Sequence, residues 1–294
     1  MNQENRHIDK KNDPDRLSDL FFSRAKIPWE KSKTEAWNDL EACIEKEDRS
    51  PVLVRRLLPG RQWLALAASL VLLFSVSAFM RFYSVKTFCP QGVHAALQLP
   101  DGSEVELNAA THVKYHPYWW FISRQVELDG EAFFHVEKGK SFKVVSSKAT
   151  TEVLGTTFNV FARGADYMVT CHTGSVKVTD AVTNESVTLS PEEKSMLKQT
   201  GGFTVTKVSD QRPEPGWTDN LIMFGSTPLR LVFEEIERQF GIVIETPAGM
   251  QQVYSGNFSL NQPVENILSL LCLPFDLAYE RQTGNTYLVY PAME

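Results

Sequence analysis

The chain has 294 residues, of which 43% are hydrophobic and 22% charged, and its formal net charge is −6. These values are ordinary for folded protein, and the length favours two or more domains. The excess acid lies after residue 80, whereas residues 1–62 are close to neutral. Because phosphate recognition needs clustered Lys and Arg, this distribution argues against direct nucleic-acid binding.

The first 62 residues combine a polar start with a short amphipathic stretch. Residues 1–15 are polar and are expected to be disordered. A helix is expected to begin near Ser32, because Ser32 and Glu35 have the spacing of a capping box. Helical spacing then places five side chains on one face: Ala36, Trp37, Leu40, Cys43 and Ile44.

Such a short segment cannot bury its large apolar side chains by itself. We therefore expect it to lie on a membrane or in the groove of a partner. Its polar face carries charges of both signs, which favours a protein partner, and a self-contained helical hairpin without function is the alternative. The residues expected to contact the partner are Phe21, Trp29, Trp37, Leu40 and Ile44.

Residues 63–80 form the strongest physical signal in the sequence. They contain no charged residue, no Pro and no Gly, and as a helix they would span about 27 Å, close to the apolar thickness of a bilayer. We predict a transmembrane helix rather than a buried helix, which usually has a polar face. Because 62 residues precede the segment, a cleaved signal peptide is disfavoured.

The charges that flank this segment predict its orientation. The 20 residues before it hold five basic side chains and the 20 after it hold two: Lys46, Arg49, Arg55, Arg56 and Arg61 against Arg81 and Lys86. By the positive-inside rule the N-terminus lies in the cytoplasm and the C-terminus is exported.

Residues 85–208 alternate apolar and polar side chains with period two, which is typical of strands. Turn signals follow at intervals of roughly ten residues and include Asp101-Gly102, Asp129-Gly130 and Gly201-Gly202. The pattern predicts an all-β domain.

Four motifs in this region carry a resemblance to a known family. They are LPDGSEVELNAATHVKY (99–115), RQVELDGEAFFHV (124–136), VLGTTFNVFA (153–162) and HTGSVKV (172–178). In this order they resemble the FecR family, where the second motif would be a strand, a turn and a strand. The family implies an anti-sigma regulator of the bacterial inner membrane that binds an ECF sigma factor in the cytoplasm.

Some proteins similar to this family cleave themselves at a Gly–Thr bond. In this reaction the Thr hydroxyl attacks the carbonyl carbon of the preceding Gly. The third motif offers this dipeptide as Gly155-Thr156. The alternative is that Gly155 is there only for a bend or for a close approach of two strands.

A linker is expected at residues 209–217, followed by a small domain at 218–294 that repeats itself with an offset of 35 residues. Each copy begins with Pro, continues as a helical apolar stripe and changes to strand alternation, from Pro228 to Glu245 and from Pro263 to Glu280. Thr227 is predicted as an N-cap, Gly241 as a C-cap, and Gly284-Asn285 as a hairpin turn. The pattern predicts an α+β domain with a duplicated helix–strand unit.

This last domain resembles the C-terminal domain of Bacteroidetes FecR-like proteins and the short signalling modules of secretins and TonB-dependent transporters. The resemblance implies docking to the signalling domain of an outer-membrane TonB-dependent transporter. A membrane-tethered periplasmic module that binds a glycan or a protein, without sigma regulation, is the rival interpretation.

Neither catalysis nor a cofactor is expected from the sequence. The six histidines show no metal-binding spacing, and no phosphate loop or nucleophile elbow occurs. The four cysteines show no CxxC pair, so neither a zinc site nor a required disulfide is predicted.

Overall fold

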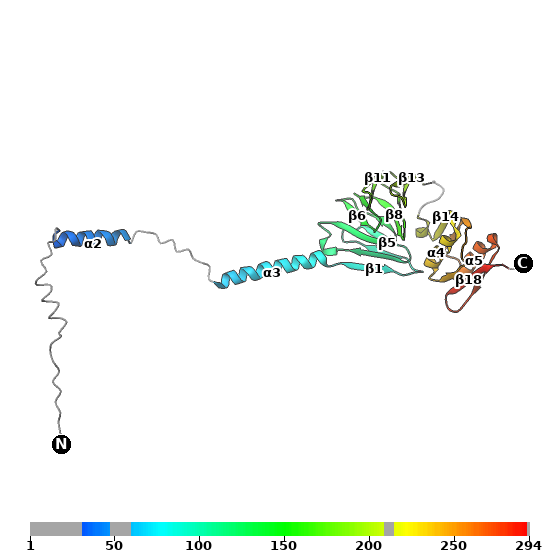
Figure 1. The fold of residues 1–294 in the computed structure, drawn as a ribbon, viewed down its shortest axis with the longest axis horizontal. Coiled ribbons are helices and arrows are strands. Elements are labelled where there is room, and N and C mark those ends of the chain that lie inside the picture. Colours follow the sequence, from blue (N-terminus) through cyan, green and yellow to red (C-terminus); the bar gives the residue numbers. More distant parts are fainter. Residues whose placement is uncertain (1–30, 48–59, 209–214, 293–294) are drawn as a thin grey trace, which may run out of the picture. The chain divides into compact units, whose positions relative to one another are not determined.

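The computed structural model describes residues 31–47, 60–208 and 215–292 (Figure 1). The predicted partner contacts at Phe21 and Trp29, the disorder of residues 1–15 and most of the predicted linker lie outside these ranges. The first described element is the helix α2, Lys33–Glu47. Its capping box is confirmed: the Ser32 backbone N–H donates to Glu35 Oε2 at 2.9 Å, and the Glu35 backbone N–H donates to Ser32 Oγ at 3.3 Å.

The predicted membrane segment is a helix, α3, that extends from Gly60 to Phe82. It is longer than the apolar run because Arg61 and Gln62 at one end and Arg81 at the other are good helix formers. No residue of α3 is buried, and the helix is long and apolar enough to cross a membrane. The expectation of one such helix is confirmed for the described residues.

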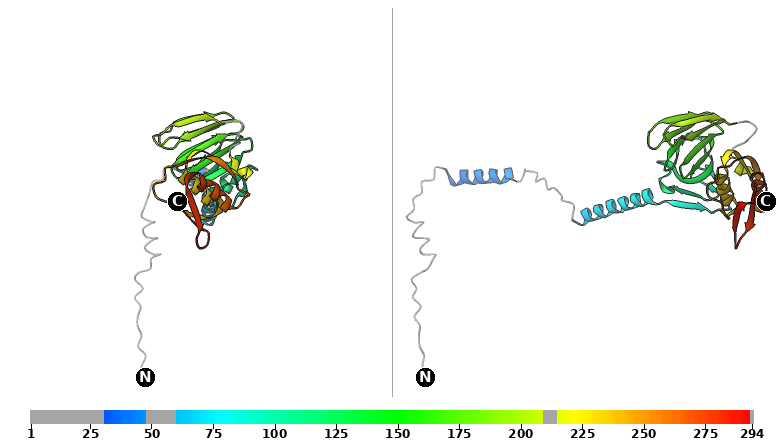
Figure 2. Two further views of the ribbon diagram at one scale, coloured as in Figure 1. Left: turned by 90° about the vertical axis from the view of Figure 1, so that its right-hand side faces the viewer. Right: turned by 45° about the vertical axis from the view of Figure 1, so that its right-hand side comes forward.

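The region after α3 is a β domain, as the alternating pattern predicts, and its strands can be followed in Figure 2. All twelve side chains at the alternating positions of Val105, Leu107, Val126, Leu128, Phe134, Val136, Phe142, Val144, Val169, Cys171, Val176 and Val178 are buried. The strands are β1 (Val85–Cys89), β2 (Ala95–Gln98), β3 (Glu104–Leu107), β4 (Thr111–Tyr115), β5 (Arg124–His135), β6 (Phe142–Val145), β7 (Ala149–Val153), β8 (Thr157–Arg163), β9 (Asp166–Cys171), β10 (Val176–Asp180), β11 (Ser186–Leu189), β12 (Glu193–Leu197) and β13 (Phe203–Lys207).

The long strand β5 joins the two halves of this domain. Its first half pairs antiparallel with β4 and parallel with β6, and its second half pairs antiparallel with β3 and β8. The two halves of the sheet then extend in opposite directions, through β7, β10 and β11 and through β9, β12 and β13. One apolar core that includes Val105, Phe134 and Phe158 lies between them.

The predicted turn at Asp129-Gly130 is wrong. Gly130 lies inside β5 with φ +128°, at the point where the pairing partners change. A Cβ at this position would lie 2.7 Å from the Cα of Thr111, so only glycine allows the strand to pass here. The glycine therefore marks a close approach inside a strand and not a chain reversal.

The C-terminal domain begins with the short turn η2 (Gly216–Asp219) and contains two helices, each preceded by a strand. Its elements are β14 (Leu221–Pro228), α4 (Leu229–Phe240), β15 (Val243–Glu245), β16 (Val253–Ser259), α5 (Val264–Cys272), η3 (Leu273–Phe275), β17 (Leu277–Arg281) and β18 (Thr286–Pro291). Strands β14 and β16 pair antiparallel, while β15, β18 and β17 form a second small sheet. A separate apolar core that includes Phe233, Ile236 and Leu268 holds the helices to the strands.

The two helices begin alike, in agreement with the repeat. Pro228 and Pro263 are their N-caps, with φ and ψ of −51° and 131° and of −56° and 141°. The predicted N-cap Thr227 is wrong: Thr227 pairs with Tyr254 in the β ladder, and the N-cap is Pro228, one residue later. The C-cap Gly241 is confirmed, with φ +63° and its N–H donating to the Glu237 carbonyl. The hairpin of β17 and β18 around Gly284 is also confirmed.

Candidate functional site

The apolar face predicted for residues 36–44 lies on α2 and is uncovered among the described residues. Trp37, Leu40 and Ile44 are 65%, 52% and 56% exposed, and Cys43 is an exposed free thiol. These three large apolar side chains lie at helical spacing and form an exposed apolar surface. We call Trp37, Leu40 and Ile44 the α2 stripe.

The dipeptide Gly155-Thr156 lies in the turn between β7 and β8. Gly155 has φ +149°, and a Cβ there would lie 2.7 Å from the Cα of Lys138, so steric need alone accounts for the glycine. Thr156 is 5% exposed, and its hydroxyl has no hydrogen-bond partner among the described residues. The hydroxyl that self-cleavage would use is therefore buried and uncommitted.

The two folded domains meet where the loop between β1 and β2 contacts the C-terminal end of α4. The Gly92 N–H donates to the Arg238 carbonyl at 2.8 Å. The last carbonyls of a helix have no partner within it, so the β domain here supplies a donor that α4 lacks. Next to this contact the His94 ring lies edge-on to Trp217 at 5.2 Å.

Gln239 is the central residue of this junction. It lies on α4 and is 7% exposed. Its Nε2 donates to Asn108 Oδ1 of the β domain at 2.8 Å and to Glu235 Oε1 at 2.7 Å, and its Oε1 lies 2.9 Å from His94 Nε2. One side chain thus connects two segments of the β domain to its own helix.

Behind Asn108 lies a buried carboxyl group, Glu131. It accepts hydrogen bonds from Asn108 Nδ2 at 2.7 Å and from Asn159 Nδ2 at 2.9 Å. Burial and then the nearby charge of Glu235 raise the pKa of Glu131, while these two hydrogen bonds oppose the shift. Burial also lowers the pKa of the neighbouring Arg163, against the opposing charges of Glu235 and Glu131.

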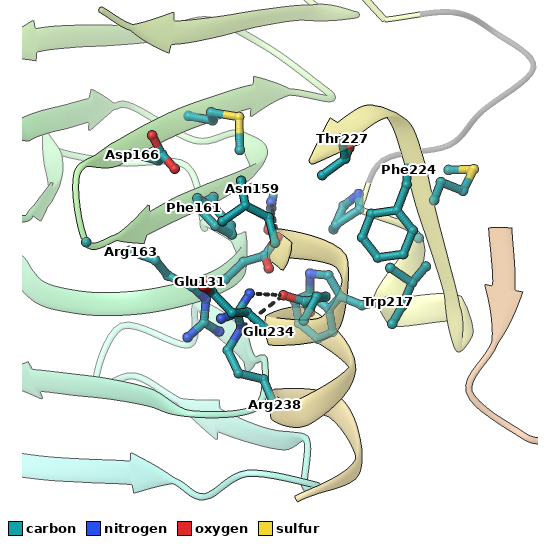
Figure 3. A pocket seen from close by; sticks show the side chains of 18 of the residues that line it. Glu131, Asn159, Phe161, Arg163, Asp166, Trp217, Phe224, Thr227, Glu234 and Arg238 are labelled. Carbon is teal, nitrogen blue, oxygen red and sulfur yellow. Dashed lines mark hydrogen bonds and ion pairs between the residues drawn. The ribbon is translucent and has the colours of Figure 1, made fainter. Parts of the chain in front are cut away.

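A cleft of about 790 Å³ opens beside this network (Figure 3). Arg163, Asn159 and Asp166 reach it from the β domain, and Trp217 and Phe224 from the C-terminal domain. Trp217 Nε1, Asn159 Oδ1 and Arg163 Nε are buried and have no hydrogen-bond partner within the described part of the chain. The described residues hold no cluster of three or more side chains that could bind a metal ion.

The junction residues Gln239, Asn108 and Glu131 are not among the site residues predicted from the sequence. One signal for Gln239 was available, because it lies three residues after Ile236 on the apolar stripe of α4 and is the polar member of that stripe. Asn108 and Glu131 lie inside the family-like motifs at 99–115 and 124–136, but their pairing depends on how β3 and β5 meet. Sequence spacing carries no information on that contact.

Comparison with known proteins agrees with the motifs. A family model for the FecR protein matches residues 85–177, and one for the FecR C-terminal region matches residues 221–289. Two crystal structures of a proposed anti-sigma factor from Parabacteroides distasonis ATCC 8503 are similar, with TM-scores of 0.65 and 0.64 and 26% identity. They match 71% and 70% of this chain and 99% of their own. No curated protein matches significantly. The chain belongs to the FecR family.

Proposed function

We propose that this chain is a single-pass membrane anti-sigma factor. Its N-terminal segment binds an ECF sigma factor in the cytoplasm, α3 crosses the inner membrane, and the β and C-terminal domains lie in the periplasm. The uncovered α2 stripe, in a chain of the FecR family, supports this function most strongly. Phe21 and Trp29 belong to the same proposed surface on sequence grounds.

The physical reason for a protein partner is the composition of α2. Its remaining side chains carry both signs of charge, and Asp39 forms an ion pair of 2.7 Å with Lys31, which lies just before the helix. A mixed-charge face gives little attraction to an anionic membrane, whereas a helix groove on a partner protein would cover the apolar stripe. By the positive-inside rule, the basic residues before α3 favour a cytoplasmic position for α2.

On the periplasmic side we propose that the C-terminal domain docks to the signalling domain of a TonB-dependent transporter. Strands β14 and β16 form a two-stranded sheet, and neither contains a charged residue. Edge strands are usually protected by charges, so an uncharged edge favours pairing with a strand of another protein. Leu270 on α5 and Leu273 on η3 are further exposed apolar side chains of the same domain, at 53% and 79%.

Co-purification from membranes tests the cytoplasmic part. Full-length protein, extracted in mild detergent, should retain a sigma factor that mass spectrometry identifies. Trp37→Ala should lose most of it, because a buried Trp at an interface contributes about 2 kcal/mol or more. Asn38→Ala, one residue along the same helix, is the matched control and should retain the sigma factor. Absence of any sigma factor with the wild-type chain would refute the proposal.

The rival function, a tethered binding module without sigma regulation, has one observation in its favour. The cleft at the junction is lined by aromatic side chains, among them Trp217 and Phe224, and by charged ones such as Asp166, which would suit a polar ligand such as a glycan. Under this alternative Trp37→Ala leaves ligand capture unchanged, and Trp217→Ala abolishes it. The two functions can therefore be distinguished: sigma regulation depends on Trp37, and ligand capture depends on Trp217.

A second candidate activity is self-cleavage at Gly155-Thr156, favoured by the buried and unpartnered Thr156 hydroxyl. That oxygen would attack the Gly155 carbonyl carbon, the peptide C–N bond would break, and water would hydrolyse the resulting ester. With tags at both ends, immunoblots of membranes should show two fragments for the wild type and for Thr156→Ser. Thr156→Ala should remain full length. Detection of full-length wild-type protein alone would exclude this activity.

A further inference from the structure

The connection between α3 and the β domain is very short. Only Tyr83 and Ser84 separate the end of α3 at Phe82 from the start of β1 at Val85. Three residue steps span at most about 11 Å, so the β domain has to lie close to the membrane surface if α3 crosses it. Val85, the first residue of β1, pairs with Tyr115, the last residue of β4. The end of β4 and the segment after it are therefore the part of the β domain nearest to the membrane.

The segment that follows Tyr115 is a compact loop of unusual composition, residues 116–123 with the sequence HPYWWFIS. Backbone bonds from Ile122 and Ser123 to the Trp119 carbonyl close it, at 3.0 and 3.1 Å. Trp120 points inward, is 5% exposed and contacts the rings of Tyr115 and Phe142. The loop is therefore anchored to the β core by one of its aromatic residues.

The other large side chains of the loop face outward. Tyr118, Phe121 and Ile122 are 47%, 64% and 54% exposed. Exposed apolar clusters of this kind are unusual on a surface that water alone covers. Aromatic residues of this type concentrate where a bilayer meets water, since their rings are apolar and Tyr and Trp also carry a polar group.

Four contacts hold this loop against the end of α3. His116 Nδ1 lies 2.9 Å from the Tyr83 carbonyl, and Arg81 stacks on the Trp119 ring at 5.5 Å. The centroid of the Tyr118 ring lies 5.2 Å from that of Tyr83 and 6.1 Å from that of Phe79. Phe79 lies two residues before Arg81, about 3 Å along the helix axis, and belongs to the uncharged part of α3. The loop thus reaches the level where α3 enters lipid.

We propose that Tyr118, Phe121 and Ile122, together with Phe82, form a foot that inserts into the bilayer surface at the C-terminal end of α3. The occupant of this apolar surface is lipid, because the foot continues the exposed apolar side of α3 and contacts it directly. The foot fixes the orientation of the β domain on the membrane, so that α3 and this domain move together. This inference rests on the proposed passage of α3 through the membrane.

Site-specific fluorescence on the full-length chain in nanodiscs tests the foot. Cys43→Ser removes the exposed thiol, and the buried Cys89, Cys171 and Cys272 remain. An environment-sensitive probe is then attached to Phe121→Cys in the foot, to Leu72→Cys in the middle of α3, or to Val182→Cys, which is 85% exposed in a turn of the β domain. Lipids with a spin label near the headgroup serve as quenchers.

At position 121 we expect blue-shifted emission and at least twofold stronger quenching by labelled lipid than at position 182. At position 72 we expect quenching by a label deeper in the acyl chain. Equal quenching at positions 121 and 182, with position 72 in lipid, would overturn the foot and leave the membrane passage intact. An aqueous probe at position 72 would overturn both.

Discussion

Gln239 and its neighbours make the contact between the two domains specific. Its amide contacts Asn108, His94 and Glu235, and each contact lies between 2.7 and 2.9 Å. Buried polar groups add little to the free energy of folding when every one has a hydrogen-bond partner, but a buried group left without a partner destabilises the fold. The junction should therefore respond sharply to loss of a single member.

We predict that Gln239→Ala lowers the free energy of unfolding by about 1–3 kcal/mol, because Asn108 and Glu235 lose a buried donor. Urea titration followed by tryptophan fluorescence measures this change. Gln282→Ala, an exposed glutamine in the C-terminal domain, is the control and should stay within about 0.5 kcal/mol of the wild type. Equal effects of the two substitutions would mean that the network does not stabilise the junction.

Glu131 predicts a dependence on pH. Its pKa is raised in the folded state, so the folded chain binds the proton more tightly than the unfolded chain. The stability that this proton contributes is complete below the unfolded pKa of about 4.5 and is lost as pH rises through the folded value. In Glu131→Gln, the urea midpoint should fall less between pH 5 and pH 7.5 than in the wild type. If the urea midpoint falls by the same amount between pH 5 and pH 7.5 in Glu131→Gln and in the wild type, Glu131 does not titrate in this way.

At the scale of elements, the alternation of side chains predicts the buried faces of the β domain but not where a strand ends. Asp129-Gly130 has the chemistry of a turn, yet the strand continues through it because Thr111 of the neighbouring strand leaves room only for glycine. The α4 cap shows the same limit. Thr227 has the right chemistry for a cap, but the ladder with β16 holds it in a strand. In both cases a contact with a distant segment overrides the local signal.

Gly130→Ala tests the close approach inside β5. Its Cβ would overlap the Thr111 backbone and its φ is positive, so we expect a strained backbone and overpacking, about 1–3 kcal/mol each. Gly164→Ala is the control, since it also has positive φ, +53°, but no atom within 4 Å of the added Cβ. Urea unfolding should show a clearly larger loss for Gly130→Ala. Equal losses would refute the steric role of Gly130.

At the scale of the whole molecule, the composition and spacing of the sequence predict the order of parts, and the structure adds how two of them are joined. The apolar run predicts α3, and the 35-residue repeat predicts the second helix–strand unit. The junction and the short link from α3 to β1 depend on contacts between segments far apart in the chain, so the sequence pattern does not reveal them. The junction connects the C-terminal domain to the β domain, and only Tyr83 and Ser84 separate the β domain from α3.

On the periplasmic side, the proposed docking surface gives a prediction for the transporter. Leu270→Glu with Leu273→Glu should weaken binding of the purified transporter signalling domain at least tenfold, since charges would face an apolar contact. Both side chains are exposed, so the fold should be retained, as circular dichroism can check. Val182→Glu, an exposed apolar position in the β domain, is the control. Unchanged binding in the double variant would place the docking surface elsewhere.

The most direct test of sigma regulation is made in cells. The chromosomal copy would carry Trp37→Ala, Leu40→Ala and Ile44→Ala together, or Asn38→Ala with Glu41→Ala as the control, and all transcripts would be sequenced. We predict that the stripe variant changes one set of transcripts whose promoters share a recognition sequence, while the control matches the wild type. Identical transcripts in the stripe variant and the wild type, with the variant present in membranes at normal level, would contradict the proposed function.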